Sequence, residues 1–464
     1  MKECVLVAGG AGYIGTHTAV ELIEAGYDVV IVDNLSNSEM KAVEGVREIT
    51  GRNVPFERVD CDDRQALAGV FDRYRFGAVI HFAASKAVGE SVEKPLLYYR
   101  NNILSLLNVL DLMREKGVRN LVFSSSCTVY GQPEALPVTE QTPRQPATSP
   151  YGNTKQICED ILRDTVAAYP ELCGIALRYF NPIGAHPSAL IGELPKGVPG
   201  NLVPFITQTA AGIRECLSVF GDDYDTPDGS AIRDYIDVVD LAKAHVVAVG
   251  RMIGGKGKNR YEYFNIGTGR GRSVLELVSL FERATGVRVP HKIVGRRTGD
   301  IEKIWADTSY ANRELGWKAE RSIEDTLRSA WAWEKRLRGI EEAGNRSAEK
   351  MPVFFRCARV RMRCVAPTFR AKTILPSDGR RFGKRKQGIL DKLSRRGLRM
   401  RRKADADNSR IGASSGRCRL LSLDFFACSC AFVESTDGDS AEYAVRSNFG
   451  GLLPSVRCRG KYIR

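Results

Sequence analysis

Short apolar runs alternate with helical patterns through the first half of the chain. An apolar run at 5–8 is followed by a helical pattern over 12–25 and a second run at 29–32. Further runs lie at 78–81, 121–123 and 174–177. Because the runs are apolar without alternation, they are typical of strands that are buried on both faces. The alternation predicts an α/β fold, a Rossmann-type doubly wound parallel sheet with helices on both sides.

The second half of the chain has a looser pattern. From about Pro182 it consists of loops rich in Gly and Pro with shorter helices, and after about residue 338 no sustained period remains. We expect a smaller α/β domain over the carboxyl edge of the sheet, where open α/β folds bind ligands. The predicted parts are a Rossmann domain at 1–181, a substrate-binding domain mainly at 182–338, and a tail at 339–464.

The basic charge of the chain lies in the tail. From residue 340 onward there are 28 Lys and Arg and 12 Asp and Glu, a net charge of +16, whereas the preceding residues carry −2. We interpret the tail as disordered, or as sequence that never formed a domain, such as a faulty gene model. The alternative is an arm that binds nucleic acid or an acidic surface. The few aromatic residues of the tail are not interleaved with its arginines on one face, which disfavours nucleic acid.

The cysteines and the hydropathy pattern predict a cytoplasmic protein. Six of the 12 cysteines precede residue 340, and they stand singly, without a CxxC pair or a histidine at metal-ligand spacing. We therefore expect reduced structural thiols and no metal site. No apolar stretch approaches the ~20 residues that span a membrane. The run at 4–8 is too short for a signal peptide.

Three glycines mark a candidate dinucleotide site. Gly9, Gly12 and Gly15 follow one another at intervals of three between the first predicted strand and helix. Glycine lets the backbone turn sharply and approach a pyrophosphate at a helix N-terminus. The second strand ends at Asp33, where a carboxylate binds the adenosine ribose and repels a 2′-phosphate. Alone, Asp33 could be a turn residue, but in this context it predicts NAD rather than NADP.

A tyrosine and a lysine form the candidate catalytic pair. Tyr151 and Lys155 open a predicted helix, and their spacing of four places both side chains on one face. An ammonium beside a phenol favours the phenolate, so we expect the tyrosine pKa to lie below its usual ~10. Tyr151 can then act as general base and acid. Ser126, with Thr128 nearby, ends a serine-rich strand and is predicted to share the hydrogen bond to the reacting hydroxyl.

Together these motifs resemble the extended short-chain dehydrogenase/reductases. Longer strings narrow the resemblance to the UDP-glucose 4-epimerase family, from Lys2 to about Arg338. The strings are VDNL at 32–35, HFA at 81–83, KAVGES at 86–91, RYFNPIGAHP at 178–187 and RDYIDV at 233–238.

The resemblance implies a complete reaction, the interconversion of UDP-glucose and UDP-galactose. Tyr151 would take the proton of the sugar 4-hydroxyl while the C4 hydride passes to NAD, and the 4-keto sugar would turn and take the hydride back on its other face. NAD would stay bound as a prosthetic group. Lys155 would position Tyr151 and hold the nicotinamide ribose, and Ser126 would bind the sugar hydroxyl. The resemblance also implies a homodimer, and the apolar faces of the predicted helices at 104–113 and 156–168 are consistent with one, although they would equally serve as ordinary core helices.

The matching positions imply two sets of contacts. Those to NAD are Gly9, Gly12, Tyr13, Ile14, Gly15, Asp33, Asn34, Asp60, Cys61, Phe82, Ala83, Lys86, Asn101, Tyr151, Lys155 and Phe180. Those to the UDP-sugar are Ser126, Thr128, Asn181, Asn201, Leu202, Val219 and Phe220 (at the uracil), Arg233 and Arg297 (at the diphosphate), Asp300 and Ile304. Ile304 stands where the family varies between a bulky aromatic and a small side chain, so acceptance of UDP-GlcNAc and UDP-GalNAc stays open.

Two other classes of protein are disfavoured. A nucleotide-sugar 4,6-dehydratase needs an Asp-Glu pair after the serine or threonine, where this chain has Cys127 and Thr128. A non-catalytic NAD-sensing or scaffold protein often lacks the tyrosine or the lysine, and here both are present.

Overall fold

Seven parallel strands form the larger sheet of the computed structural model, which describes residues 3–297 and 301–340. Their order across the sheet is β10-β6-β5-β4-β1-β2-β3. This arrangement confirms the predicted Rossmann-type fold. The strands are β1 (Cys4–Ala8), β2 (Asp28–Val32), β3 (Phe56–Glu57), β4 (Ala78–His81), β5 (Asn120–Ser126), β6 (Cys173–Tyr179) and β10 (Tyr261–Ile266).

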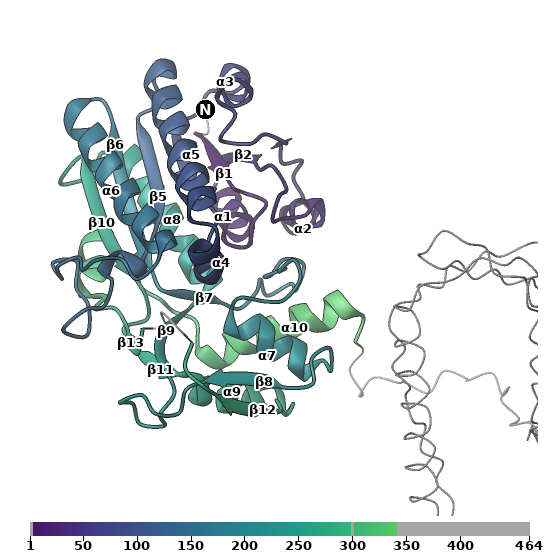
Figure 1. Ribbon diagram of the computed structural model, residues 1–464. Coiled ribbons are helices and arrows are strands. Elements are labelled where there is room, and N and C mark those ends of the chain that lie inside the picture. The colour runs from purple at the N-terminus through teal and green to yellow at the C-terminus, as the bar shows by residue number, and fades with distance from the viewer. Residues whose placement is uncertain (1–2, 298–300, 341–464) are drawn as a thin grey trace, which may run out of the picture. The chain divides into compact units, whose positions relative to one another are not determined.

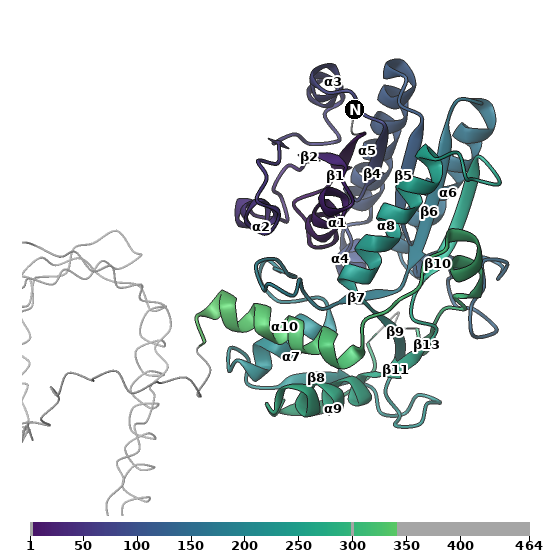
Figure 2. The same cartoon turned by 180° about the vertical axis from the view of Figure 1, so that it is seen from behind.

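Helices cover both faces of this sheet, as the apolar strands predict. In β1, Val5 and Val7 face one hydrophobic cluster, and Leu6 and Ala8 face another. Figure 1 shows α5 and α6 in front of the sheet, and Figure 2, from behind, shows α8. The first cluster includes α1 (Tyr13–Glu24), α2 (Met40–Thr50) and α8 (Val238–Ile253), and the second includes α3 (Arg64–Arg73), α5 (Pro95–Lys116) and α6 (Pro150–Ala168).

The strand order reverses between β1 and β4. The chain runs from β1 outward to β2 and β3, and then returns to β4 on the other side of β1. In open α/β sheets the connections leave opposite faces at such a point, so a crevice forms at the carboxyl ends of the strands. The glycine turn follows β1 and Phe82 follows β4, and both therefore border this crevice.

A smaller lobe lies beside the carboxyl edge of the large sheet (Figure 1). Its core packs α7, α9 and α10 around two short sheets, with Ile206, Phe281 and Leu327 fully buried. One sheet has the order β11-β9-β13, with β7 paired to β9, and the other pairs β12 with β8. The elements are β7 (Asn181–Ile183), α7 (Leu202–Ala210), β8 (Leu217–Phe220), β9 (Ile232–Asp237), β11 (Gly271–Ser273), α9 (Val274–Thr285), β12 (His291–Val294), β13 (Lys303–Ile304) and α10 (Ile323–Arg338).

The chain passes between the two lobes more than once. Both α8 and β10 follow residue 182 in the chain, but β10 is a strand of the large sheet and α8 packs against one of its faces. Three short helices complete the described part: α4 (Val88–Glu93), η1 (Cys127–Tyr130) and η2 (Ala311–Leu315). Nearly all of the predicted tail lies outside the described residues. Within residues 3–297 and 301–340, no helix has the length and apolar character to cross a membrane.

Candidate active site

The glycine turn leaves no room for side chains. A Cβ on Gly9, whose φ is +76°, would lie 2.6 Å from the backbone nitrogen of Ala83. A Cβ on Gly15 would lie 2.6 Å from the carbonyl oxygen of Gly9. Helix α1 begins directly after this turn, and its N-cap, Gly12, provides no side-chain hydrogen bond. The first amides of α1, including those of Tyr13 and Ile14, are thus available to an anionic group.

Acidic and amide side chains lie at the ends of β2 and β3. Asp33 Oδ2 accepts a hydrogen bond from the Ala11 amide at 3.1 Å, so the carboxylate is held against the glycine turn. The neighbouring Asn34 donates from Nδ2 to Asp60 Oδ2 at 2.8 Å. Cys61 is buried beside them. The structure therefore brings these candidate cofactor residues together at one side of the crevice.

The segment after β4 forms the opposite side of the glycine turn. The amides of Phe82 and Ala83 both donate to the carbonyl of Ala8, at 2.8 and 3.1 Å. The Lys86 Nζ lies 6.0 Å from the centroid of the Tyr13 ring. Asn101 donates from Nδ2 to Ser85 Oγ at 3.2 Å.

The three candidate catalytic residues meet where β5 ends and α6 begins. Ser126 is the last residue of β5, and its Oγ accepts from the Thr128 amide at 3.2 Å. The Ser126 hydroxyl lies beside the phenol of Tyr151, in the first turn of α6, close enough to influence its pKa. The Lys155 Nζ lies 5.8 Å from the centroid of the Tyr151 ring. Ser149 caps α6 by accepting from the Gly152 amide, which fixes the start of this helix.

The expected low pKa of Tyr151 is wrong for the protein without a cofactor. Burial raises the pKa of Tyr151 well above its usual value of 10, and the neighbouring Ser126 hydroxyl lowers it only in part. Burial also lowers the pKa of Lys155 to about 8. Its Nζ donates to the carbonyl oxygen of Ser124 at 2.7 Å. The sequence-based expectation counted the attraction between the two side chains but not the loss of water around the phenolate.

The Thr128 Oγ1 points to a polar ligand at this site. It is buried and has no hydrogen-bond partner. Buried hydroxyl groups in proteins are nearly always paired, so such an atom calls for a partner that the described chain does not supply. A sugar hydroxyl next to Ser126 and Tyr151 has the matching chemistry.

Three of the candidate substrate residues lie on paired strands of the smaller lobe. Arg233 lies on β9, and Ile304 pairs with it in register from β13. Ile304 is 1% exposed and packs in one cluster with Phe180 and Cys127, close to the catalytic residues. Asn181 begins β7, which pairs in parallel with β9 farther along that strand, at 235–237. Asp300 falls outside the described residues.

The candidate uracil residues lie farther along this lobe. Val219 is buried in β8, whereas the adjacent Phe220 is 41% exposed. The guanidinium carbon of Arg297 lies 5.5 Å from the centroid of the Phe220 ring. Asn201 precedes α7 as its N-cap, and Leu202 is the first residue of that helix.

A buried ion pair behind the catalytic residues was missed in the sequence. The carboxylate of Glu159 accepts two hydrogen bonds from Arg178, at 2.9 and 2.6 Å, and one from Ser125 Oγ at 2.5 Å. Glu159 lies on α6 one turn after Lys155, and Ser125 precedes Ser126. Glu159 lies four residues after Lys155, so the sequence already placed it on the same face of the helix. It was not singled out because an acidic side chain in a helix is usually exposed.

Comparisons with known proteins agree with this geometry. The model of a family described as GDP-mannose 4,6 dehydratase matches residues 6–330. UDP-glucose 4-epimerase of Dictyostelium discoideum is 52% identical over 334 residues, which cover 72% of this chain and 96% of that protein. The human UDP-glucose 4-epimerase is 49% identical over 341 residues, with 72% and 97% covered.

A solved structure extends the agreement to the fold. UDP-glucose 4-epimerase from Bifidobacterium longum, in complex with NAD+ and UDP, is 49% identical and superimposes with a TM-score of 0.69. It matches 72% of this chain and 98% of its own. The resemblance drawn from the sequence motifs is therefore confirmed. By its sequence, its fold and these relatives, the chain belongs to the UDP-glucose 4-epimerase family, within the larger family that the GDP-mannose 4,6 dehydratase model describes.

Proposed function

We propose that this chain interconverts UDP-glucose and UDP-galactose, with NAD as a retained cofactor. The observation that carries the proposal is the meeting of Ser126, Tyr151 and Lys155 at the carboxyl edge of the large sheet, the edge that also carries the glycine turn. It is supported by relatives named UDP-glucose 4-epimerase that are about half identical over nearly their whole length. The Bifidobacterium longum relative supports the choice of ligands, because it holds NAD+ and UDP.

The residues at the crevice fit a dinucleotide. At Gly9 and Gly15 a Cβ would collide with the backbone, so the turn keeps a bare peptide surface that a pyrophosphate can approach. We assign the adenosine ribose to Asp33 and the nicotinamide ribose to Lys155. When bound, NAD supplies an acceptor for the hydride of the sugar C4 that also returns it. The other cofactor contacts in this proposal are Gly12, Tyr13, Ile14, Asn34, Asp60, Cys61, Phe82, Ala83, Lys86, Asn101, Tyr151 and Phe180.

Tyr151 moves the proton in this proposal. The Ser126 hydroxyl lies beside its phenol, so a sugar 4-hydroxyl that approaches Ser126 comes within reach of both oxygens. The ammonium of Lys155 holds a positive charge near the phenol and opposes the effect of burial. The positive charge of oxidised nicotinamide acts in the same direction. We therefore expect the pKa of Tyr151 to fall when the cofactor binds.

The smaller lobe binds the UDP part of the substrate. Arg233 and Arg297 suit the diphosphate because a guanidinium pairs with phosphate oxygens. Phe220, which is exposed, suits the flat uracil ring. A firm hold on UDP leaves the sugar free to turn between the two faces presented to the cofactor. The remaining contacts that we assign to the substrate are Thr128, Asn181, Asn201, Leu202, Val219, Asp300 and Ile304.

We further propose a homodimer. Apolar side chains with exposed fractions between 37% and 74% gather on α4 and α5: Val88, Val92, Leu96, Leu97, Leu104 and Leu107. A second copy of α5 and α6 would remove this surface from water. We place the protein in the cytoplasm, since the described cysteines, such as the buried Cys61 and Cys158, are free thiols.

A direct assay tests the proposal. Purified full-length protein is incubated with UDP-galactose without added NAD, and UDP-glucose is measured. Conversion supports the proposed activity and a retained cofactor. If neither this incubation nor one with added NAD forms UDP-glucose, the proposed activity is wrong.

A further inference from the structure

The loop between β7 and α7 reaches from the smaller lobe to the cofactor side of the crevice. The Lys196 Nζ donates to the carbonyls of Leu35 and Ser36, two and three residues after Asp33, at 3.0 and 2.9 Å. Four residues earlier in the same loop, a Cβ on Gly192 would lie 2.5 Å from the ring of Trp333. The loop is thus attached to both lobes.

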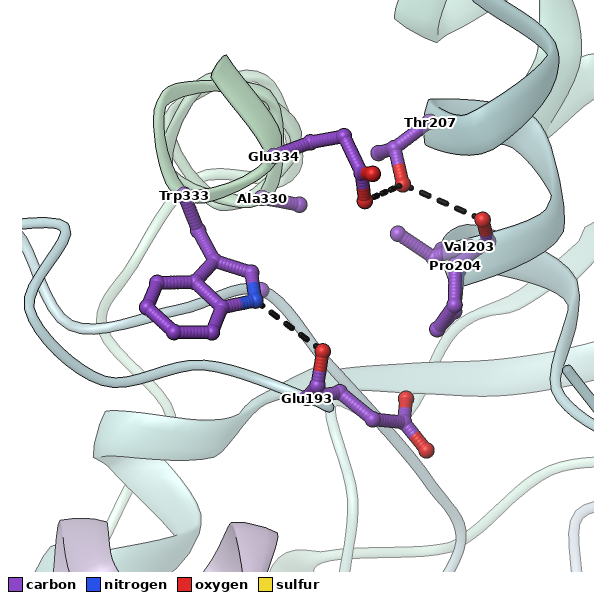
Figure 3. A pocket seen from close by; sticks show the side chains of 8 residues that line it. Glu193, Val203, Pro204, Thr207, Ala330, Trp333 and Glu334 are labelled. Carbon is purple, nitrogen blue, oxygen red and sulfur yellow. Dashed lines mark hydrogen bonds between the residues drawn. The ribbon is translucent and has the colours of Figure 1, made fainter. Parts of the chain in front are cut away.

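Glu193 is held firmly within this loop. The Trp333 Nε1, on α10, donates to the Glu193 carbonyl at 3.0 Å. Figure 3 shows this contact and the Glu193 carboxylate pointing away from the indole. The backbone of Glu193 is therefore fixed by the smaller lobe, and its side chain, with 12% of its area exposed, extends toward Lys86.

One carboxylate oxygen of Glu193 contacts both the segment after β4 and the smaller lobe. Its Oε1 accepts from Asn201 Nδ2 at 2.6 Å and forms an ion pair with Lys86 Nζ at 3.3 Å. Lys86 lies near Tyr13 in the glycine turn, and the charge of Glu193 contributes to raising the Tyr13 pKa. Asn201 is the N-cap of α7 in the smaller lobe.

We propose that Glu193 is a positioning residue that couples occupancy of the cofactor site to occupancy of the nucleotide-sugar site. This inference rests on the proposed function, because it takes Lys86 as a contact of NAD and Asn201 as a contact of UDP. A ligand that fixes either residue also fixes the shared carboxylate, so the partner residue is already oriented for the second ligand. Such coupling is reciprocal at equilibrium: UDP tightens the binding of NAD by the factor by which NAD tightens the binding of UDP.

The ratio of two NAD release rates tests this coupling, because tighter binding of NAD in the presence of UDP appears as slower release. Full-length protein is diluted with and without saturating UDP, and released NAD is quantified in filtrates over time. We expect UDP to slow release about fivefold or more in the unaltered protein, the lower end of usual coupling. In Glu193→Ala the factor falls below about twofold. In Glu193→Gln, which keeps an acceptor oxygen but no charge, the factor is intermediate.

A matched control separates coupling from damage to the fold. Glu48→Gln removes the same charge from a pair with Arg336, 3.7 Å long and exposed, and keeps the full UDP effect. A purely structural role of Glu193 would speed release equally with and without UDP and leave the ratio unchanged. An unchanged ratio in both Glu193 variants, or no UDP effect in the unaltered protein, overturns the coupling. Failure of the unaltered protein to epimerise overturns the proposed function instead.

Discussion

The Lys155 ammonium donates to the backbone carbonyl of Ser124 at 2.7 Å, two residues before Ser126. This bond ties the start of α6 to the end of β5, so the strand and the helix that carry the catalytic side chains move as one unit. Lys155 consequently has a role in the fold as well as a charge near Tyr151. The charge of Lys155 depends on pH, because burial lowers its pKa to about 8.

Replacing Tyr151 with Phe removes the phenol hydroxyl, which is the proposed proton acceptor, and keeps the ring. We expect kcat to fall by roughly 10²- to 10⁴-fold, the usual contribution of general acid–base catalysis. Most of the NAD should stay bound, because the other proposed cofactor contacts remain. Tyr261→Phe is the matched control, because the Tyr261 hydroxyl is buried without a partner and can be lost without cost. The initial rate and the NAD content of both purified variants are measured. Near-normal activity of the Tyr151→Phe variant would exclude Tyr151 as the base.

Lys155→Met removes a group whose pKa the fold lowers from 10.5 to about 8. Between these values the unfolded chain binds more protons than the folded one, so the Lys155 contribution to stability rises with pH. The cost of burying the ammonium is fully present below pH 8 and fades toward pH 10.5, by up to about 3 kcal/mol. Urea unfolding of cofactor-free protein should therefore show the wild type gaining stability relative to Lys155→Met from pH 7.5 to 9.5. Parallel pH profiles would contradict this account.

Glu159→Ala leaves the buried Arg178 without its carboxylate. Breaking such a pair usually costs about 3–5 kcal/mol, so the free energy of unfolding falls by that amount. The control is Glu262→Ala, which breaks the similarly buried pair with Arg251, away from α6. Both variants should lose stability, but only Glu159→Ala should also lower kcat, because Glu159 holds Ser125 beside Ser126. Equal kcat in the two folded variants would show that the pair is purely structural.

Ile304→Ala enlarges the space beside Phe180 and Cys127. We expect kcat/KM for UDP-GalNAc to rise relative to that for UDP-galactose, and Ile304→Phe to lower the same ratio. The alanine variant also loses about 2–5 kcal/mol of stability, so the ratio of the two substrates is more informative than either rate. Ile236→Ala, in a fully buried position of another cluster, controls for stability. If the ratio of the two kcat/KM values changes equally in both alanine variants, Ile304 does not line the sugar pocket.

Leu96→Lys places a charge on a residue of α5 that is 74% exposed. If the apolar surface of α4 and α5 is the dimer interface, the variant becomes a monomer in light scattering after size exclusion. Ile213→Lys alters an apolar side chain in the smaller lobe that is 49% exposed, and this control should stay dimeric. A Leu96→Lys variant with unchanged mass would place the interface elsewhere.

The sequence predicted the large sheet well because its signals are local. The apolar run in β1 and the glycine turn after it depend on neighbouring residues alone, and the structure places them as expected. Ser126, Tyr151 and Lys155 also come from short motifs at strand and helix ends. They come together because α6 connects the neighbouring parallel strands β5 and β6 and therefore begins near the carboxyl end of β5.

The features that the sequence did not predict depend on distant contacts or on burial. Glu193 acquires its position from Trp333, far along the chain, so no local pattern reveals it. The return of β10 to the large sheet is likewise a pairing between distant segments. The raised pKa of Tyr151 reflects the removal of water, which spacing alone cannot measure.

The most direct test of the proposed reaction uses UDP-galactose with deuterium at C4, incubated with the full-length protein in ordinary water. If the C4 hydride leaves to bound NAD and returns to the other face, the UDP-glucose formed keeps the deuterium, because the hydride never exchanges with solvent. Mass spectrometry of the product should show full retention of the label. UDP-glucose that has lost the deuterium to water would contradict the account, since inversion would then proceed through a proton.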